Sequence, residues 1–142
     1  MANQFQVEIV SAEAAIFAGS ASMIVVNGLL GELGIAANHI PLLTLIRPGP
    51  VRVLQADDAE QVIFVSGGIL EVQPKIVTIL ADVVMRADAL DEETAQAARD
   101  KAMEALQVTH EGDFDYTMAR AELARAAGML RTIQEARKRF KI

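Results

Sequence analysis

The sequence contains no cysteine and only two histidines. The lack of cysteine excludes disulfide bridges, thiolate catalysis and zinc–thiolate sites. His39 and His110 do not lie at metal-ligand spacing, so we expect no metal site. The segment FVSGG (64–68) lacks the first glycine of a nucleophile elbow, and a Ser/His/Asp triad would have to use one of these two histidines. We therefore expect no catalytic residues and no cofactor.

Long apolar runs are also missing. No stretch approaches the ~18 to 20 uninterrupted apolar residues that span a bilayer, and the N-terminus has no basic region followed by an apolar run. We expect a soluble chain without direct membrane insertion. Its net charge of -6 repels phosphate backbones and anionic lipid head groups, so nucleic acid is not an expected partner.

The first part of the chain has the pattern of short strands. Phe5, Val7 and Ile9 alternate with polar residues, which is the period of a half-buried strand. Further strand-length apolar runs cover residues 23–26, 33–35, 42–46, 51–54, 62–65, 69–72, 76–80 and 83–85. Turn-forming residues such as Gly, Pro, Asn and Asp separate most of these runs. Many short strands with frequent turns indicate a small β-sandwich or barrel.

The composition changes near Ala87 to residues that favour helices. We place the domain boundary there, with a β domain at 1–86 and a helical domain at 87–142. Asp88 or Asp91 can cap a first helix that runs to about Gln107. Asp113 or Asp115 can cap a second helix that starts near Tyr116 and extends toward the C-terminus.

The two helices carry matching stripes of small and apolar residues. The stripes step by three and four residues, as in a coiled coil, so we predict an antiparallel hairpin. The predicted seam consists of Ala95, Ala98, Ala102 and Ala105 on the first helix and Tyr116, Ala119, Leu123, Ala126, Leu130 and Ile133 on the second. Because alanine buries a single methyl group, worth ~0.8 kcal/mol per carbon, this seam is weaker than one made of leucine. We expect a hairpin of marginal stability that depends on contacts with the β domain or with a partner.

Charge is unevenly distributed in the helical half. Residues 88–130 hold 10 acidic and 4 basic residues, whereas 131–142 hold five basic residues and one acidic residue. One or two cations are enough to complement the C-terminal end of a helix dipole, and five exceed that need. Two interpretations remain open, a solvated helix end and a docking end for an acidic protein surface.

Several segments together carry a resemblance to a known family. In chain order they are FQVEIVSAE, GELGI, the His39–Thr44 stretch H-x-PLLT, SGGILEVQP and DYTMARAELARA. Taken together, they resemble the epsilon subunit of bacterial F-type ATP synthase over nearly the whole length. The resemblance implies an α+β chain: an N-terminal ten-stranded β-sandwich followed by a C-terminal antiparallel two-helix hairpin.

The resemblance also implies partners and a location. The expected role is a non-catalytic rotor subunit that binds gamma and sits on the c-ring, peripheral to the cytoplasmic face of the bacterial inner membrane. Taken by itself, the glycine-rich run GLLGELGI (28–35) predicts only a tight strand-to-strand loop, since it lacks the phosphate-loop and dinucleotide motifs. The family places this loop on the ring-facing end, and the implied contacts are Glu32, His39, Pro41 and Leu42. Ala37-Asn38 stands where members often have Pro-Gly, so loop geometry is expected to differ slightly.

In this family the helical domain inhibits ATP hydrolysis when its last helix extends into the catalytic head beside gamma. A helix over 116–140 has 25 residues and spans ~37 Å, so its length allows deep entry. The implied contacts with acidic loops of the alpha and beta subunits are Arg120, Arg125, Arg131, Arg137, Lys138 and Arg139.

Two alternative functions are considered. The first is a nucleotide sensor, because some members bind ATP at the hairpin through a motif that ends in Arg-Ala. In this chain Thr94 replaces that arginine, so we predict weak or absent ATP binding, with Asp91, Arg99 and Arg120 as the candidate residues. The second is a free-standing adaptor whose basic tail binds nucleic acid, and the overall charge disfavours it.

Overall fold

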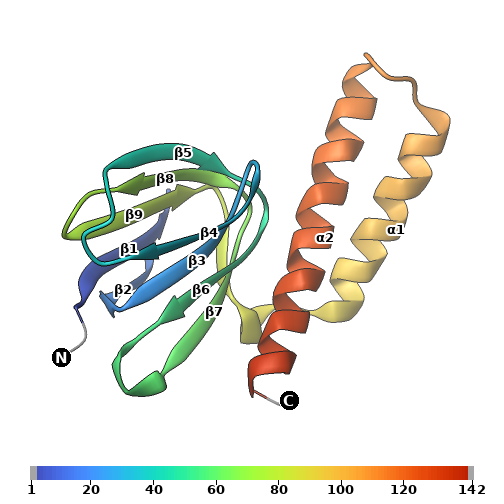
Figure 1. The fold of residues 1–142 in the computed structure, drawn as a ribbon. Coiled ribbons are helices and arrows are strands. Elements are labelled where there is room, and N and C mark those ends of the chain that lie inside the picture. The colour runs from blue at the N-terminus through green and yellow to red at the C-terminus, as the bar shows by residue number, and fades with distance from the viewer. Residues whose placement is uncertain (1–2, 141–142) are drawn as a thin grey trace.

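The computed structural model describes residues 3–140 as a ten-stranded β-sandwich followed by a helical hairpin (Figure 1). The strands are β1 (Phe5–Ser11), β2 (Ala15–Ala21), β3 (Met23–Gly28), β4 (Gly31–Ala36), β5 (Leu42–Ile46), β6 (Gly49–Leu54), β7 (Glu60–Val65), β8 (Gly68–Val72), β9 (Ile76–Ala81) and β10 (Val84–Arg86). The helices are α1 (Glu92–Val108) and α2 (Phe114–Phe140), with short 3-10 turns η1 (Ala56–Asp58) and η2 (Ala87–Ala89). The predicted fold class is confirmed.

The strands form one continuous path that folds into two layers. Their order is β10-β7-β6-β3-β5-β8-β9-β1-β2, with β4 paired to the other side of β3. β3 meets β5 only at Gly28 and Ile46, so the layer containing β6 and β7 separates there from the layer containing β8 and β9. β1 and β9 are the parallel pair, and the other pairs in the described chain are antiparallel.

Alternating apolar residues fill the space between the layers. Val7, Ile9 and Ile24 are fully buried, as are Ile63 and Leu70. Side chains alternate across a strand, so Val62 and Phe64 point to the opposite face of β7 from Ile63 and Val65. Val62 and Phe64 are also buried, although they are not part of the sandwich core. The outer face of β7 is therefore covered, and the helices cover it.

The start of β8 requires glycine at position 68. Its φ is 153°, and a Cβ at this position would lie 2.1 Å from the carbonyl oxygen of Leu80. Only glycine allows β8 to approach β9 this closely. The run Ser66-Gly67-Gly68 is thus part of the turn into β8.

The hairpin stands beside the sandwich, with α2 between the sandwich and α1 (Figure 1). α2 contacts β6, β7 and η2, and α1 packs on α2. Asp91 caps α1, as one of the two predicted alternatives, by accepting a hydrogen bond from the amide of Thr94. α2 begins two residues before the predicted Tyr116.

Candidate functional site: the docked hairpin and the exposed sandwich face

α2 buries two different faces. Toward α1 it presents Ala119, Ala126, Leu130 and Ile133, which are buried, with Leu123 and Tyr116 half-buried. A second set is buried as well and was not predicted from the sequence: Gly128, Thr132 and Ala136. These three follow one another at a spacing of four residues, so they share a helix face. α2 is therefore packed on both sides, against α1 and against the sandwich.

The predicted seam is shifted on α1. Ala95 and Ala102 are buried and Ala105 is half-buried, but Ala98 is exposed. Arg99 occupies the half-buried position instead. With 3.6 residues per turn, residues 98 and 99 lie about 50° on either side of a face centred on 95 and 102, so the observed burial, and not the spacing, distinguishes them. Ala98 is therefore corrected to an exposed position, whereas Leu106, which was not part of the predicted seam, is half-buried.

The backbone of α2 approaches the backbone of the sandwich closely at Gly128. A Cβ added there would lie 2.8 Å from the carbonyl carbon of Pro48 and 2.9 Å from the nitrogen of Gly49. Arg131, almost one turn further, donates a hydrogen bond from Nη2 to the carbonyl oxygen of Pro48 at 2.7 Å. The buried hydroxyl of Thr132 donates to the carbonyl oxygen of Gly128 at 2.8 Å, so this polar group is satisfied within the helix.

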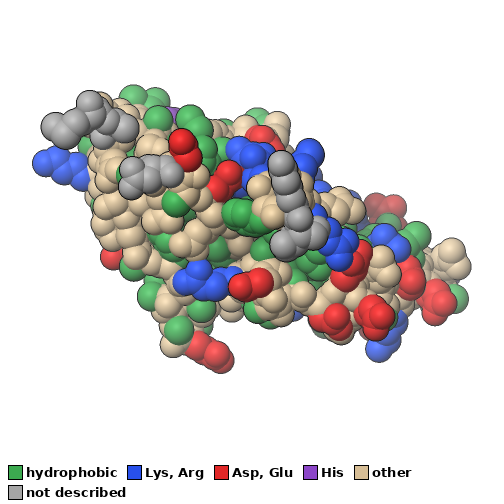
Figure 2. Space-filling model, turned by 90° about the horizontal axis from the view of Figure 1, so that it is seen from below, with side chains coloured by type: hydrophobic (Ala, Val, Ile, Leu, Met, Phe, Trp, Pro, Cys, Tyr) green, Lys and Arg blue, Asp and Glu red, His purple; other side chains and the backbone are tan. Residues whose placement is uncertain are grey.

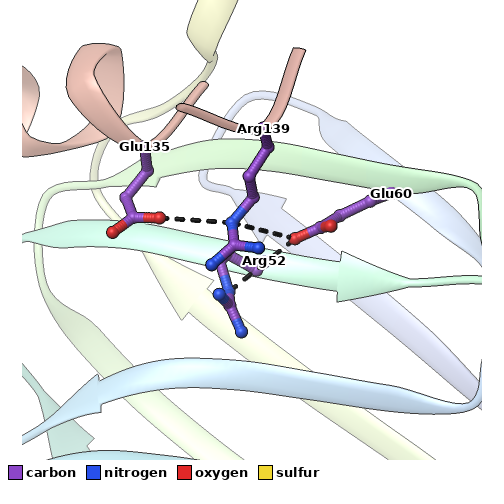
Figure 3. Close-up of polar contacts among 4 residues, drawn as sticks. All are labelled: Arg52, Glu60, Glu135 and Arg139. Atoms are coloured by element: carbon purple, nitrogen blue, oxygen red, sulfur yellow. Dashed lines mark hydrogen bonds and ion pairs between the residues drawn. The ribbon is translucent and has the colours of Figure 1, made fainter. Parts of the chain in front are cut away.

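A small charge network joins the end of α2 to the outer face of the sandwich (Figure 3). Glu60 Oε1 lies 3.3 Å from Arg139 Nε and 3.8 Å from Arg52 Nε. Glu135, one turn before Arg139 on α2, contacts the same Nε at 3.2 Å. The side chains of Glu60 and Arg52 are 19% and 21% exposed, so water and salt screen these pairs less than they screen a fully exposed pair.

Contacts in the first turn of α1 stabilise the base of the hairpin, where α1 begins and α2 ends. The carboxylate of Asp91 accepts hydrogen bonds from the hydroxyl and the amide of Thr94, which lower its pKa. Arg137 donates a hydrogen bond to Glu92, and this contact lowers the pKa of Glu92 and raises that of Arg137. The last turns of α2 are thus tied to the start of α1.

Acid is expected to weaken this tie. Because the folded-state pKa of Glu92 lies below its ordinary value of 4.5, the pair stabilises the fold above that pH, and the effect is lost as the pH falls through the lowered pKa. Both side chains are well exposed, so we expect a small effect. The measurement is urea unfolding of the chain and of Glu92→Gln between about pH 6 and about pH 3. The stability difference between the two should shrink toward zero in acid; a difference that stays constant would contradict the assignment.

The nucleotide candidates do not come together. Asp91 lies at the base of the hairpin and is engaged by Thr94. Arg120 lies near the opposite end, beside Glu111 and Tyr116. Arg99 is between them on α1 and contacts Asp100 at 3.5 Å. Arg137, which bonds to Glu92 next to Asp91, lies 17 positions from Arg120 along α2, or ~25 Å. This separation is too large for Asp91 and Arg120 to share one phosphate.

The six cations predicted to contact the catalytic head fall into two groups. Arg120, Arg125 and Lys138 are exposed on α2. Arg131, Arg137 and Arg139 are bonded to Pro48, Glu92 and Glu60 of the same chain. Seen from below, acidic side chains gather on the helical part away from the sandwich, and basic side chains lie nearer the junction between the two parts (Figure 2). In the docked hairpin, three of these six cations are therefore already bonded to groups of the same chain.

The ring-contact candidates lie in β4, in the connection from β4 to β5 and at the start of β5. Glu32 and Leu42 line one apolar hollow of about 430 Å³ together with Leu29 and Leu30. His39 and Pro41 lie in the connection from β4 to β5, where His39 Nδ1 is 2.7 Å from the carbonyl oxygen of Ile40. Asn38 has a φ of 63°, a left-handed conformation that glycine adopts freely and asparagine tolerates.

Exposed apolar residues on the sandwich were missed by the sequence analysis. Leu30 at the β3–β4 turn is fully exposed. Leu45, Ile69 and Leu80 are 54%, 43% and 49% exposed and lie side by side across β5, β8 and β9, because Leu45 pairs with Ile69 and Ile69 with Leu80. An outward row of apolar side chains on three neighbouring strands is typical of a protein interface. We call these three residues the apolar row.

Other classes of site receive no support within residues 3–140. No group of three or more His, Asp or Glu side chains in this range is arranged to hold a metal ion. Neither α1 nor α2 combines the length and the apolar character needed to cross a membrane.

These features define a β-sandwich protein with a docked C-terminal helical hairpin, whose most prominent sites are contact surfaces. The family model described as "ATP synthase, Delta/Epsilon chain, beta-sandwich domain" matches residues 4–87, and the model of the long alpha-helix domain matches residues 88–134. The chain therefore belongs to the ATP synthase delta/epsilon chain family, among its epsilon chains, as the resemblance predicted.

Individual relatives agree with this assignment. The ATP synthase epsilon chain of Chromohalobacter salexigens is 51% identical over 95% of both chains. That of Legionella pneumophila strain Corby is 52% identical over 94% of this chain and 95% of the relative. Among solved structures, a chain of the Euglena gracilis mitochondrial ATP synthase has a TM-score of 0.80 at 19% identity, with 89% of this chain and 79% of that chain covered. A chain of the Tetrahymena thermophila mitochondrial ATP synthase has a TM-score of 0.58 at 12% identity, with 91% and 96% covered. At these identities the two structures show a common fold.

Proposed function

We propose that this chain is a non-catalytic subunit of the central stalk of an F-type proton-translocating ATP synthase. In this proposal residues 1–86 join gamma to the c-ring, and residues 87–142 inhibit ATP hydrolysis when they extend into the catalytic head. The chain would lie at the cytoplasmic face of the bacterial membrane as a peripheral part of the complex. The Euglena structure in which a similar fold occurs is an assembly of F1 with a c-ring, and the Tetrahymena structure is a central stalk with its c-ring.

The apolar row is the observation that carries the first half of the proposal. Three half-exposed aliphatic side chains on one sheet face lose unfavourable contact with water when a partner covers them. We assign this face to gamma. The β3–β4 turn, with exposed Leu30 beside Glu32, is assigned to the polar loops of the ring, together with His39, Pro41 and Leu42.

The docked hairpin supports the second half. α1 contributes only two fully buried alanines, so little apolar surface opposes separation of the helices. Release of α2 from the sandwich frees Arg131 and Arg139, and opening of the hairpin base frees Arg137. Those cations, with Arg120, Arg125 and Lys138, would then face acidic surfaces of the alpha and beta subunits.

The direct test compares ATP hydrolysis by head complexes that carry either the whole chain or a chain that ends at Ala87. Faster hydrolysis with the shortened chain supports inhibition by the hairpin. Equal rates would remove the inhibitory role and leave the role in assembly.

A further inference from the structure

The contact between the hairpin and the sandwich is concentrated on the second half of α2. Gly128 packs on the backbone of Pro48 and Gly49, Arg131 bonds to Pro48, and Arg139 contacts Glu60. Further along, Ala136 and Phe140 line a hollow with Val62 of β7. We call Gly128 and Arg131 together with Pro48 and Gly49 the Gly128 contact.

Glycine is a poor choice for the helix itself. In the middle of a 27-residue helix it lowers helix stability relative to alanine, since it loses more backbone freedom on folding. At position 128 it is required by the neighbour, because the atoms that a Cβ would meet at 2.8–3.0 Å all belong to the Pro48–Gly49 backbone. The ring of Pro48 fixes its φ and so limits how far this segment can move aside. Either the helix or the turn must shift if residue 128 gains a side chain.

The hydrogen bond at this contact is specific to the docked arrangement. The carbonyl oxygen of Pro48 accepts from Arg131 Nη2 at 2.7 Å and from Asn27 Nδ2 at 3.3 Å. Asn27 belongs to β3 and stays with the sandwich, whereas Arg131 leaves with the helix. The bond from Arg131 to Pro48 is therefore lost when α2 leaves the sandwich.

We propose that the Gly128 contact sets the balance between docked and released hairpin, and that the alanine seam between the helices does not. In this view α2 first leaves the sandwich, the weak seam then lets the two helices separate, and the absence of a side chain at residue 128 is what permits docking. Only the consequence of release, inhibition of ATP hydrolysis by the head, rests on the proposed function. Docking itself is a property of the isolated chain and is tested there.

The test uses thiol alkylation of the full chain, which has no cysteine of its own. Val62→Cys places a thiol on the outer face of β7 beneath α2, where the native residue is 5% exposed, so it reacts when the hairpin leaves. Val53→Cys places one in the sandwich core, where the native residue is fully buried, so it reacts only on unfolding. When reclosing is faster than alkylation, each rate reports the population of the corresponding open state.

Gly128→Ala is expected to raise the alkylation rate at the Val62→Cys thiol at least about ten-fold and to leave the rate at the Val53→Cys thiol unchanged. The matched control is Ala124→Gly, the opposite change at an exposed position one turn earlier on α2, which lowers helix propensity without touching Pro48. It should leave both rates near those of the parent chain. An unchanged rate at the Val62→Cys thiol, or an equal rise at both thiols, would overturn the proposal.

Arg131→Gln provides a second variant that adds no atoms to the contact. It removes the bond to Pro48 and should raise the Val62→Cys rate alone, by less than Gly128→Ala; no change at that thiol would also count against the proposal. Measuring ATP hydrolysis by head complexes with Gly128→Ala separates the two claims. Faster alkylation without stronger inhibition keeps the Gly128 contact and refutes the inhibitory role, whereas unchanged alkylation refutes the contact whatever the hydrolysis rate.

Discussion

Ending the chain at Ala87 should raise ATP hydrolysis by reassembled head complexes by about five-fold or more, the lower end of typical couplings between protein sites. The expected increase follows from removal of α1 and α2 together with all six cations proposed to meet the head. The apolar row and the β3–β4 turn lie before the cut, so the shortened chain should still join the complex. The measurement is steady-state hydrolysis at matched subunit content.

The cut also uncovers Val62 and Phe64, which α2 shields in the whole chain, so a control must keep the hairpin in place. Arg120→Glu with Arg125→Glu reverses two exposed charges and leaves the sandwich covered. This double variant should relieve part of the inhibition, whereas Lys101→Glu on the exposed side of α1 should have little effect. Hydrolysis that stays the same after both the truncation and the charge reversal would contradict inhibition by the basic helix.

Ile69→Asp should weaken binding to gamma by at least about 30-fold, the effect of losing about 2 kcal/mol at an interface hot spot. Ile69 is the central member of the apolar row, between Leu45 and Leu80. In the bound state a carboxylate there would lie among aliphatic side chains without a partner, which is costly. The native side chain is 43% exposed, so the substitution should leave the fold intact. Binding of purified gamma by titration calorimetry gives the dissociation constant directly.

Met118→Asp is the matched control for this prediction. Met118 is 47% exposed, close to the value for Ile69, but it lies on α2 and outside the sandwich. It should leave the affinity for gamma within about two-fold of the parent chain, as for a surface position outside an interface. Equal loss in both variants would indicate a nonspecific effect of charge, and no loss for Ile69→Asp would place the gamma contact elsewhere.

Much of the fold was accessible from the sequence because local and tertiary preferences agree. β1 alternates clearly, and the strand-length apolar runs from 23–26 onward all contain strand in the structure. β2 was missed because its sequence, AIFAGSA, is rich in residues of low β propensity. It is a strand because it pairs with β1 and buries Phe17 and Ala21. Such pairing depends on distant residues, so a local pattern does not reveal it.

The site was less accessible, for two physical reasons. On α2 the seam toward α1 has a strong apolar period, whereas Gly128, Thr132 and Ala136 contact the sandwich through small side chains with weak hydropathy. Their spacing of four was the available signal. On β5, the run Leu42-Leu43-Thr44-Leu45-Ile46 predicts a strand but does not show which side chains face the core, and Leu43 and Leu45 prove to face outward. The sequence alone does not distinguish an apolar residue at an interface from an apolar residue in the core.

The most direct test of the account is the distance between two spin labels in the assembled enzyme. Asp82→Cys, in the turn between β9 and β10, and Glu122→Cys on α2 are both exposed, and the chain adds no other thiol. The account predicts one short distance in the isolated chain and an additional, longer distance in inhibited head complexes, as α2 moves away from the sandwich. The same short distance in both samples, with inhibition intact, would contradict it.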